Sequence, residues 1–162
     1  MESPILREIE NEVIQLVLEY AEQVTLWANA MFFCRFEEKP EELEKYPYFQ
    51  SFDPKQYKGL SKDEIRMRYE TMFQEYTTPK KREYAGKSTS SFGYPAKYQG
   101  LEQENITEVV LVNKNRCEVT CKVPTGFKQT IKFVALKKQN KWLLDSVKSY
   151  SKSDDKWSNS IL

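Results

Sequence analysis

The spacing of apolar residues changes abruptly along this chain. Before Tyr76 they recur at steps of three or four, which is the period of an amphipathic helix. From Ile106 to Tyr150 they alternate with polar residues, which is the period of a half-buried strand. Each kind of element buries only one face, so helices that precede strands must pack together on one sheet. The sequence therefore predicts an α+β fold.

The first helix is expected to be long. Ser3 is a candidate N-cap, and Pro4 suits the first helical turn, where proline loses no hydrogen bond. An apolar stripe then continues for about eight turns at 3.6 residues per turn. Its members are Ile5, Ile9, Val13, Leu16, Tyr20, Val24, Trp27 and Met31. A stripe of this length predicts a helix that lies across an equally long apolar surface.

A second helix is predicted to follow Ser61. Ser61 and Glu64 have the spacing of a capping box, in which each side chain satisfies a free backbone N–H group. Its inward stripe is Ile65, Tyr69, Met72, Phe73 and Tyr76. A short helix over residues 41–45 is also compatible with the sequence, because Pro47 would end it.

Four strands are expected over residues 106–112, 117–123, 127–136 and 142–150. The turns between them read NKNR, PTG and KKQNK, and connections this short join neighbouring antiparallel strands. Cys117, Val119, Cys121 and Val123 are predicted to share the buried face of the second strand. The result is a curved antiparallel meander that carries the long helix and the further helices.

At 162 residues the chain has the length of one domain, so residues 1–162 are expected to form a single α+β domain. The tail, residues 151–162, is expected to be flexible or to pack back on the helices through Trp157, Ile161 and Leu162. A partner that meets these apolar side chains is a further alternative. A monomer and a homodimer are both compatible with this organisation.

The absence of histidine excludes much chemistry. It removes serine–histidine–aspartate and cysteine–histidine nucleophile pairs and nearly all zinc sites. Five scattered glycines do not form a phosphate-binding loop. Three cysteines do not suggest a disulfide framework, and Cys34, Cys117 and Cys121 are interpreted as buried small residues. No metal and no cofactor are therefore expected.

Carboxylate chemistry remains open. Asp145 lies in an apolar strand, between Leu144 and Val147, and Glu70 on the second helix can face a cavity. Either carboxylate can serve as the general base of a small-molecule isomerase or dehydratase. The alternative is structural: both acids lie at a rim or pair with a lysine.

Charge is divided between the two halves. Residues 1–76 hold 16 acidic and 9 basic residues, and residues 77–162 hold 8 acidic and 16 basic residues. These balances of −7 and +8 give the net charge of +1. The division predicts two faces of opposite potential, unless the halves neutralise each other. Charged residues interrupt the apolar run at the N-terminus, and no stretch reaches the roughly 18 apolar residues of a membrane span, so a cytoplasmic protein without membrane contact is expected.

The stretch TTPKKREYAGKSTSSFGYPAKY, residues 77–98, allows several interpretations. Lys80, Lys81 and Arg82 resemble a phosphate-contacting or nuclear-localisation patch, but they can equally complement the negative end of the preceding helix. Its tyrosines can stack on bases or tuck under the sheet. The acidic first half argues against direct nucleic-acid binding, which leaves a structural connection as the favoured interpretation.

Three segments carry a resemblance to a known family. They read TPKKREY at residues 78–84, SFGYPAKY at 91–98 and FVALKKQNKWLLDSVKSY at 133–150. In their order and spacing they resemble the bacterial polymorphic-toxin immunity proteins with the nuclear transport factor 2-like fold. The resemblance implies a cone-shaped fold without catalytic activity. It also implies a role: binding and neutralising a cognate toxin, often an enzyme that attacks nucleic acid. A small-molecule isomerase or dehydratase, and a non-enzymatic ligand-binding or adaptor domain, are the alternatives.

If the chain binds a toxin, the acidic, aromatic-rich segment over residues 37–53 is the first candidate surface, because acids and tyrosines suit a basic partner. Its predicted contact residues are Glu37, Glu38, Glu41, Glu42, Glu44, Tyr46, Tyr48 and Asp53. The alternative is a solvated connection with its aromatics packed inward. The second candidate surface is the mouth of the cone. It comprises Lys80, Lys81, Arg82, Tyr84, Tyr94, Tyr98 and Asp145.

Overall fold

A long helix, a shorter helix and an antiparallel sheet make up the described part of the computed structural model, namely residues 4–34, 41, 45, 60–80, 96–126, 128–160 and 162. The helices are α1 (Pro4–Phe33) and α2 (Lys62–Tyr76), followed by the short 3₁₀ helix η5 (Gln103–Asn105). The strands are β1 (Ile106–Asn113), β2 (Arg116–Lys122), β3 (Thr130–Lys138), β4 (Lys141–Ser151) and β5 (Lys156–Ser160). The predicted α+β order of helices first and strands second is confirmed.

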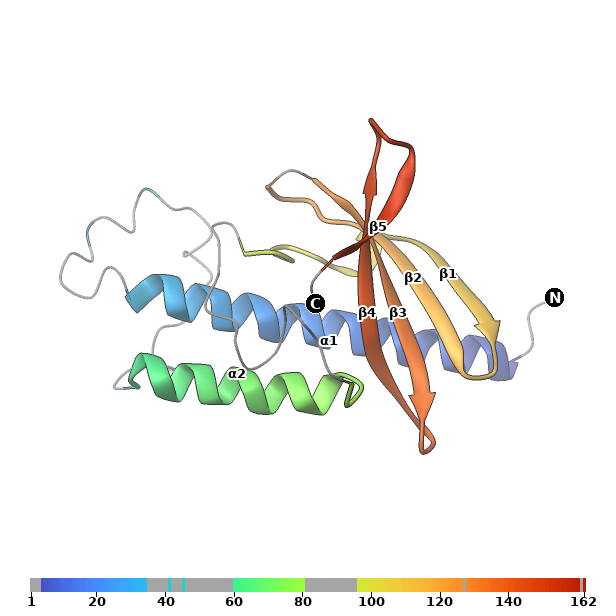
Figure 1. Ribbon diagram of the computed structural model, residues 1–162, viewed down its shortest axis with the longest axis horizontal. Coiled ribbons are helices and arrows are strands. Elements are labelled where there is room, and N and C mark those ends of the chain that lie inside the picture. The colour runs from blue at the N-terminus through green and yellow to red at the C-terminus, as the bar shows by residue number, and fades with distance from the viewer. Residues whose placement is uncertain are drawn as a thin grey trace.

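The five strands form one sheet in the order β1-β2-β3-β4-β5, and each pairs antiparallel with the next. Figure 1 shows the twisted sheet lying across α1, with α2 beside α1 and running in the opposite direction. Helix α1 contacts β1, β2 and β4 as well as α2. It is therefore the element that joins the helical layer to the sheet.

The apolar stripe of α1 is buried over most of its predicted length, but not at its start. Val13, Val17 and Tyr20 are fully buried, and Met31 is 2% exposed. Ile5, by contrast, is 69% exposed, so its predicted place in the buried stripe is wrong. In Figure 1, α1 begins beside the turn of the β1–β2 hairpin, so its first turn lies at the end of the sheet and the rest of the helix lies beneath it.

Helix α2 follows its sequence signals closely. The Ser61 hydroxyl accepts a hydrogen bond from the Glu64 N–H group at 3.2 Å, which confirms Ser61 as the N-cap. The Glu64 carboxylate lies 3.3 Å from the Ser61 hydroxyl, a different contact from the one to the backbone N–H group that a capping box predicts. Ile65, Tyr69, Met72 and Phe73 are buried as expected. The rings of Tyr69 and Trp27 stack with their centroids 4.3 Å apart, and this contact ties α2 to α1.

The loop between β2 and β3 is longer than predicted. The expected strand began at Phe127, which lies outside the described residues, whereas β3 begins at Thr130. Gly126 and Lys128 have positive φ angles of 63° and 52°, which a strand does not allow. The chain therefore needs several more residues to reverse its direction than the PTG turn suggested.

A bulge in β4 changes which side chains face the core. Val134 pairs with Ser146 and Ala135 pairs with Leu144, so the register between β3 and β4 skips Asp145. The extra residue lets both Leu144 and Val147 point inward although they are three positions apart. In a strand without a bulge, residues three positions apart face opposite sides of the sheet. The bulge therefore determines where the Asp145 side chain lies.

The tail folds as a strand. Instead of the flexible segment expected after residue 150, β5 pairs with β4, and Tyr150 lies opposite Trp157 with ring centroids 5.3 Å apart. The Lys132 ammonium lies 4.3 Å from the centroid of the Trp157 ring. Leu162 is 7% exposed and joins the hydrophobic core. These aromatic cross-strand contacts stabilise the tail as a strand, although its polar composition did not indicate one.

Aromatic rings and thiols fill the space between α1 and the sheet. Phe133 is fully buried, and its ring centroid lies 5.3 Å from that of Tyr98 and 6.4 Å from that of Tyr20. Cys117 and Cys121 are also fully buried, as predicted, whereas Cys34 is only half-buried.

The two buried thiols are expected to resist alkylation. Burial raises the pKa of Cys117 to about 11 and that of Cys121 to about 12. An ordinary cysteine, with a pKa of about 8.5, is largely thiolate at pH 9, so these two should stay protonated there. Iodoacetamide at pH 8 to 9 should modify both only in denaturant, as measured by peptide mass spectrometry. Rapid modification of Cys121 in the native protein would contradict this packing.

Candidate functional site

Asp145 lies at the end of α2, where the helix meets the sheet. Its Oδ1 atom accepts a hydrogen bond of 2.8 Å from the Thr78 hydroxyl, and its Oδ2 atom lies 2.9 Å from the Lys80 ammonium. The Thr78 N–H group also donates to the Leu144 carbonyl at 2.9 Å. We refer to Thr78, Lys80 and Asp145 as the latch. Residues more than sixty positions apart thereby fix the chain that leaves α2 against the β4 bulge.

The latch bears on two alternatives that the sequence left open. Asp145 pairs with a lysine at a rim, because both of its oxygens accept hydrogen bonds from the chain's own side chains. Lys80 pairs with this carboxylate, and the end of α2 is capped instead by Thr77, whose N–H group donates to the Phe73 carbonyl. Glu70, the other candidate base, is half-buried on α2. Asp145 therefore has the contacts of a structural carboxylate.

Tyr98 lies inside the fold and not at its surface. It is 1% exposed, and its ring packs between those of Tyr20 and Phe133. Burial raises the pKa of its hydroxyl well above the ordinary value, and among the described residues the hydroxyl meets no hydrogen-bond partner. The interpretation that this tyrosine lines the interior of the cone agrees with its position.

Most of the predicted partner-binding residues lie outside the described part of the chain. These are Glu37, Glu38, Glu42, Glu44, Tyr46, Tyr48 and Asp53, and from the second surface Lys81, Arg82, Tyr84 and Tyr94. Glu41 is described and exposed. The acidic segment connects Phe33 at the end of α1 to Ser61 at the start of α2, and in Figure 1 these two ends lie at the same end of the helix pair.

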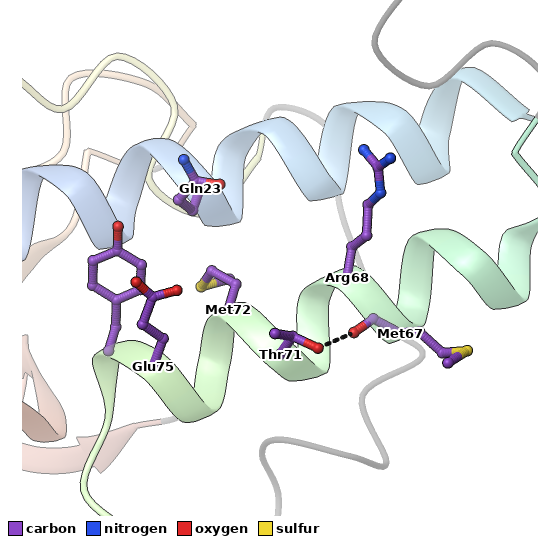
Figure 2. A pocket seen from close by; sticks show the side chains of 7 residues that line it. Gln23, Met67, Arg68, Thr71, Met72 and Glu75 are labelled. Atoms are coloured by element: carbon purple, nitrogen blue, oxygen red, sulfur yellow. Dashed lines mark hydrogen bonds between the residues drawn. The ribbon is translucent and has the colours of Figure 1, made fainter.

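A groove between α1 and α2 is a feature that the sequence reasoning missed. Figure 2 shows its side chains: one comes from α1 and six from α2, and its volume is about 420 Å³. They are Gln23, Met67, Arg68, Thr71, Met72, Glu75 and Tyr76. Met67 is 65% exposed and points outward from α2. A methionine outside the inward stripe of α2 was the only sequence signal of this groove.

Acidic side chains gather at one end of the groove. The carboxylates of Glu19, Glu75 and Glu22 lie close enough to the half-buried Tyr76 hydroxyl to act on its ionisation. Burial, followed by the negative charges of Glu19 and Glu75, raises the pKa of Tyr76. Three carboxylates thus converge on one tyrosine from two helices. Glu75 lines the groove, and we call it, together with Glu19 and Glu22 near Tyr76, the acidic end of the groove.

Positive charge gathers elsewhere, at the turns of two hairpins. The β1–β2 turn and the β3–β4 hairpin are joined by a 2.9 Å hydrogen bond from the Lys137 N–H group to the Asn115 carbonyl. Lys114 and Lys137 line a shallow pocket of about 440 Å³ there, and Lys138 and Lys141 follow in the β3–β4 hairpin. Helix α1, in contrast, carries five glutamates and one arginine. In the described residues, the two helices therefore carry a net negative charge, and the sheet with its turns carries a net positive charge.

The described residues show neither a metal site nor a membrane-spanning helix. They contain no group of three histidine, cysteine, aspartate or glutamate residues that could hold a metal ion. Neither described helix combines the length and the apolar character that crossing a bilayer requires.

Known proteins similar to this chain share one kind of role. Residues 31–160 match the family described as NTF2 fold immunity protein. The chain is also 28% identical over 116 residues to "Immunity protein RhsIA" of Dickeya dadantii (strain 3937), an alignment that spans 72% of this chain and 81% of that protein. No solved structure matches the chain.

Proposed function

Since this chain belongs to the family of NTF2 fold immunity proteins and therefore has a toxin-neutralising role, we propose that it acts by binding one cognate toxin enzyme directly and without catalysis. The family match over residues 31–160 carries this proposal, and the similarity to an immunity protein along most of that protein's length supports it. The toxin is proposed to be an enzyme that acts on nucleic acid.

The distribution of charge supports a partner of this kind. An enzyme that binds a phosphate backbone presents basic side chains along its cleft. The negative charge of α1 would steer such a surface toward the helical layer and accelerate association. A non-catalytic inhibitor needs only to cover that cleft, and it needs no reactive group of its own.

The latch is consistent with inhibition by binding. An isomerase or dehydratase built on Asp145 would need its carboxylate to take a proton from a substrate. Here Thr78 and Lys80 occupy the two oxygens of that carboxylate. The isomerase alternative gains no support from this geometry.

The experiment that tests the proposal uses the toxin domain encoded by the adjacent gene. The tagged immunity protein should co-purify with that domain as a stoichiometric complex and should abolish its nuclease activity in a purified assay. Failure to bind the toxin domain at micromolar concentrations would contradict direct inhibition. Binding of a toxin without nuclease activity would contradict only the proposed enzyme class.

Reversing three charges of the acidic segment is expected to weaken toxin binding. The variant Glu41→Lys/Glu42→Lys/Glu44→Lys should bind roughly tenfold more weakly, with a smaller dependence on salt, because attraction to the basic cleft is lost. Isothermal titration calorimetry at two salt concentrations measures both effects. The control Glu104→Lys/Glu108→Lys/Asp154→Lys changes net charge equally at exposed positions elsewhere. Equal affinities for the two variants would move the site away from residues 37–53.

A further inference from the structure

We propose that the groove between α1 and α2 is a docking site for the toxin, and that it holds a toxin segment with an apolar side chain beside lysine or arginine. This proposal rests on the proposed function and assigns to it a surface that lies within the described residues. The segment would lie along the groove, with its basic side chains at the acidic end and its apolar side chain against Met67 and Met72.

The groove has the apolar contact that a docked segment needs. Met67 is 65% exposed and presents an apolar side chain at the groove, and Met72 lines the groove on the same helix toward the acidic end. Methionine side chains are flexible and polarisable, and they fit the irregular shape of a partner at low cost. Contact with an apolar side chain of the toxin would remove Met67 from water and would make it an anchor of the interface.

The acidic end determines the charge of the occupant. Glu75 lines the groove beside Tyr76, and the negative charges of Glu19 and Glu22 on α1 also act on this tyrosine, so like charges lie near one another in the free protein. A lysine or arginine brought into this cluster would relieve the repulsion and could donate hydrogen bonds to the carboxylates. Tyr76 adds a half-buried aromatic ring, a side chain that is frequent at the energetic centre of interfaces.

The two ends of the groove also give it a direction. Arg68 lies near the middle of α2, at the end of the groove away from Glu75 and Tyr76, which lie at the C-terminal end of the helix. An occupant with its basic side chains near Arg68 would meet like charge, so only one orientation along the groove is favourable. In the sequence, residues 37–53 lie between the end of α1 and the start of α2, so the groove lies on the two helices that flank the predicted partner-binding segment.

Two other exposed surfaces suit this partner less well. The turns that carry Lys114 and Lys137 are basic and would repel a basic cleft. The edge strand β1 exposes Val110 and Val112, which are 41% and 51% exposed, but among its own residues it has only Glu108 as an acid. Apolar contact and concentrated negative charge occur together at the groove.

The test compares four single variants with the wild-type protein, using the purified toxin domain of the adjacent gene. Met67→Asp and Glu75→Lys are each expected to raise the Kd at least tenfold, and Glu75→Lys should also reduce the salt dependence of binding. Val110→Asp and Glu108→Lys are matched controls on β1, and their Kd values should stay within twofold of wild type. Circular dichroism and thermal melting verify that every variant is folded.

Hydrogen exchange gives a second, mutation-free readout. Toxin binding is expected to slow exchange of the α2 amides and of the facing turns of α1, and to leave the exchange of β1 unchanged. If the wild-type protein binds the toxin but the groove variants bind equally well and α2 shows no added protection, the groove proposal is wrong while the proposed function stands. If the wild-type protein does not bind, the proposed function fails, and the groove proposal fails with it.

Discussion

Phe133→Ala is expected to lower the free energy of unfolding by about 3–5 kcal/mol, the usual cost of removing a buried aromatic ring. Phe133 is fully buried on β3, and its ring contacts those of Tyr20 on α1 and Tyr98. The lost ring would leave a cavity where the sheet, the long helix and the chain before β1 meet. Because domains of this size are stable by about 5–15 kcal/mol, the change is a large share of the total.

Urea denaturation followed by circular dichroism measures this loss. The control Phe133→Leu keeps most of the side-chain volume and should cost less than about 1.5 kcal/mol. A cost below about 1 kcal/mol for Phe133→Ala would mean that the ring is not at the centre of the core. If the alanine variant does not fold at all, the stability of the leucine variant provides the test. It should still fold and cost less than about 1.5 kcal/mol, because it keeps most of the side-chain volume.

Asp145→Ala is expected to lower the free energy of unfolding by about 2 kcal/mol. Most of this loss comes from Thr78, which is 3% exposed and would lose the acceptor of its hydroxyl, a loss of about 1–3 kcal/mol. The contribution of Lys80 is smaller, since 45% of its side chain is exposed and solvent screens the ion pair. The latch should therefore act mainly through the buried hydrogen bond.

Three companion variants separate these contributions. Asp145→Asn keeps an acceptor for the Thr78 hydroxyl and should cost less than Asp145→Ala, and Lys80→Ala should cost less than about 1 kcal/mol. Thr78→Val removes the hydroxyl with little change in shape, and a double-mutant cycle with Asp145→Ala measures the coupling. A coupling energy near zero would show that the hydrogen bond does not hold α2 to β4. Unchanged stability with loss of toxin neutralisation would place Asp145 in the interface instead.

The elements that local periodicity controls were predictable from the sequence. The Ser61 cap, the inward stripe of α2 and the alternating burial of β2 depend on residues close together in the chain. The same is true of the meander, because short turns leave successive strands no other partner. The family resemblance rested on the connection after α2 and on the last hairpin, and the family match confirms it.

Features set by contacts between distant residues were not predictable. The bulge at Asp145 arises because both Leu144 and Val147 must reach the core, and nothing within β4 alone requires it. The pairing of Asp145 with Thr78 and Lys80 joins residues that only the folded chain brings together. Likewise, β5 depends on Tyr150 and Lys132 contacting Trp157, although its own composition resembles a flexible tail.

The candidate site likewise combines a feature that local composition indicates with a feature that only the packing of the two helices creates. Acids and tyrosines in residues 37–53 could be recognised as a possible binding surface by composition alone, and this prediction remains to be tested. The groove requires Glu19 and Glu22 of α1 to approach Glu75 of α2, which depends on how the two helices pack. Only the outward position of Met67, away from the stripe of α2, carried a sequence signal for it.

The most direct test of the central claim is the growth of bacteria that express the toxin domain of the adjacent gene. Cells that also express this protein should grow at the rate of cells without the toxin, and cells with an empty plasmid should stop growing. A non-cognate nuclease toxin serves as the specificity control and should remain lethal. Arrested growth in the presence of the folded immunity protein, at expression levels that exceed the toxin, would contradict the claim that this chain neutralises that toxin by binding it.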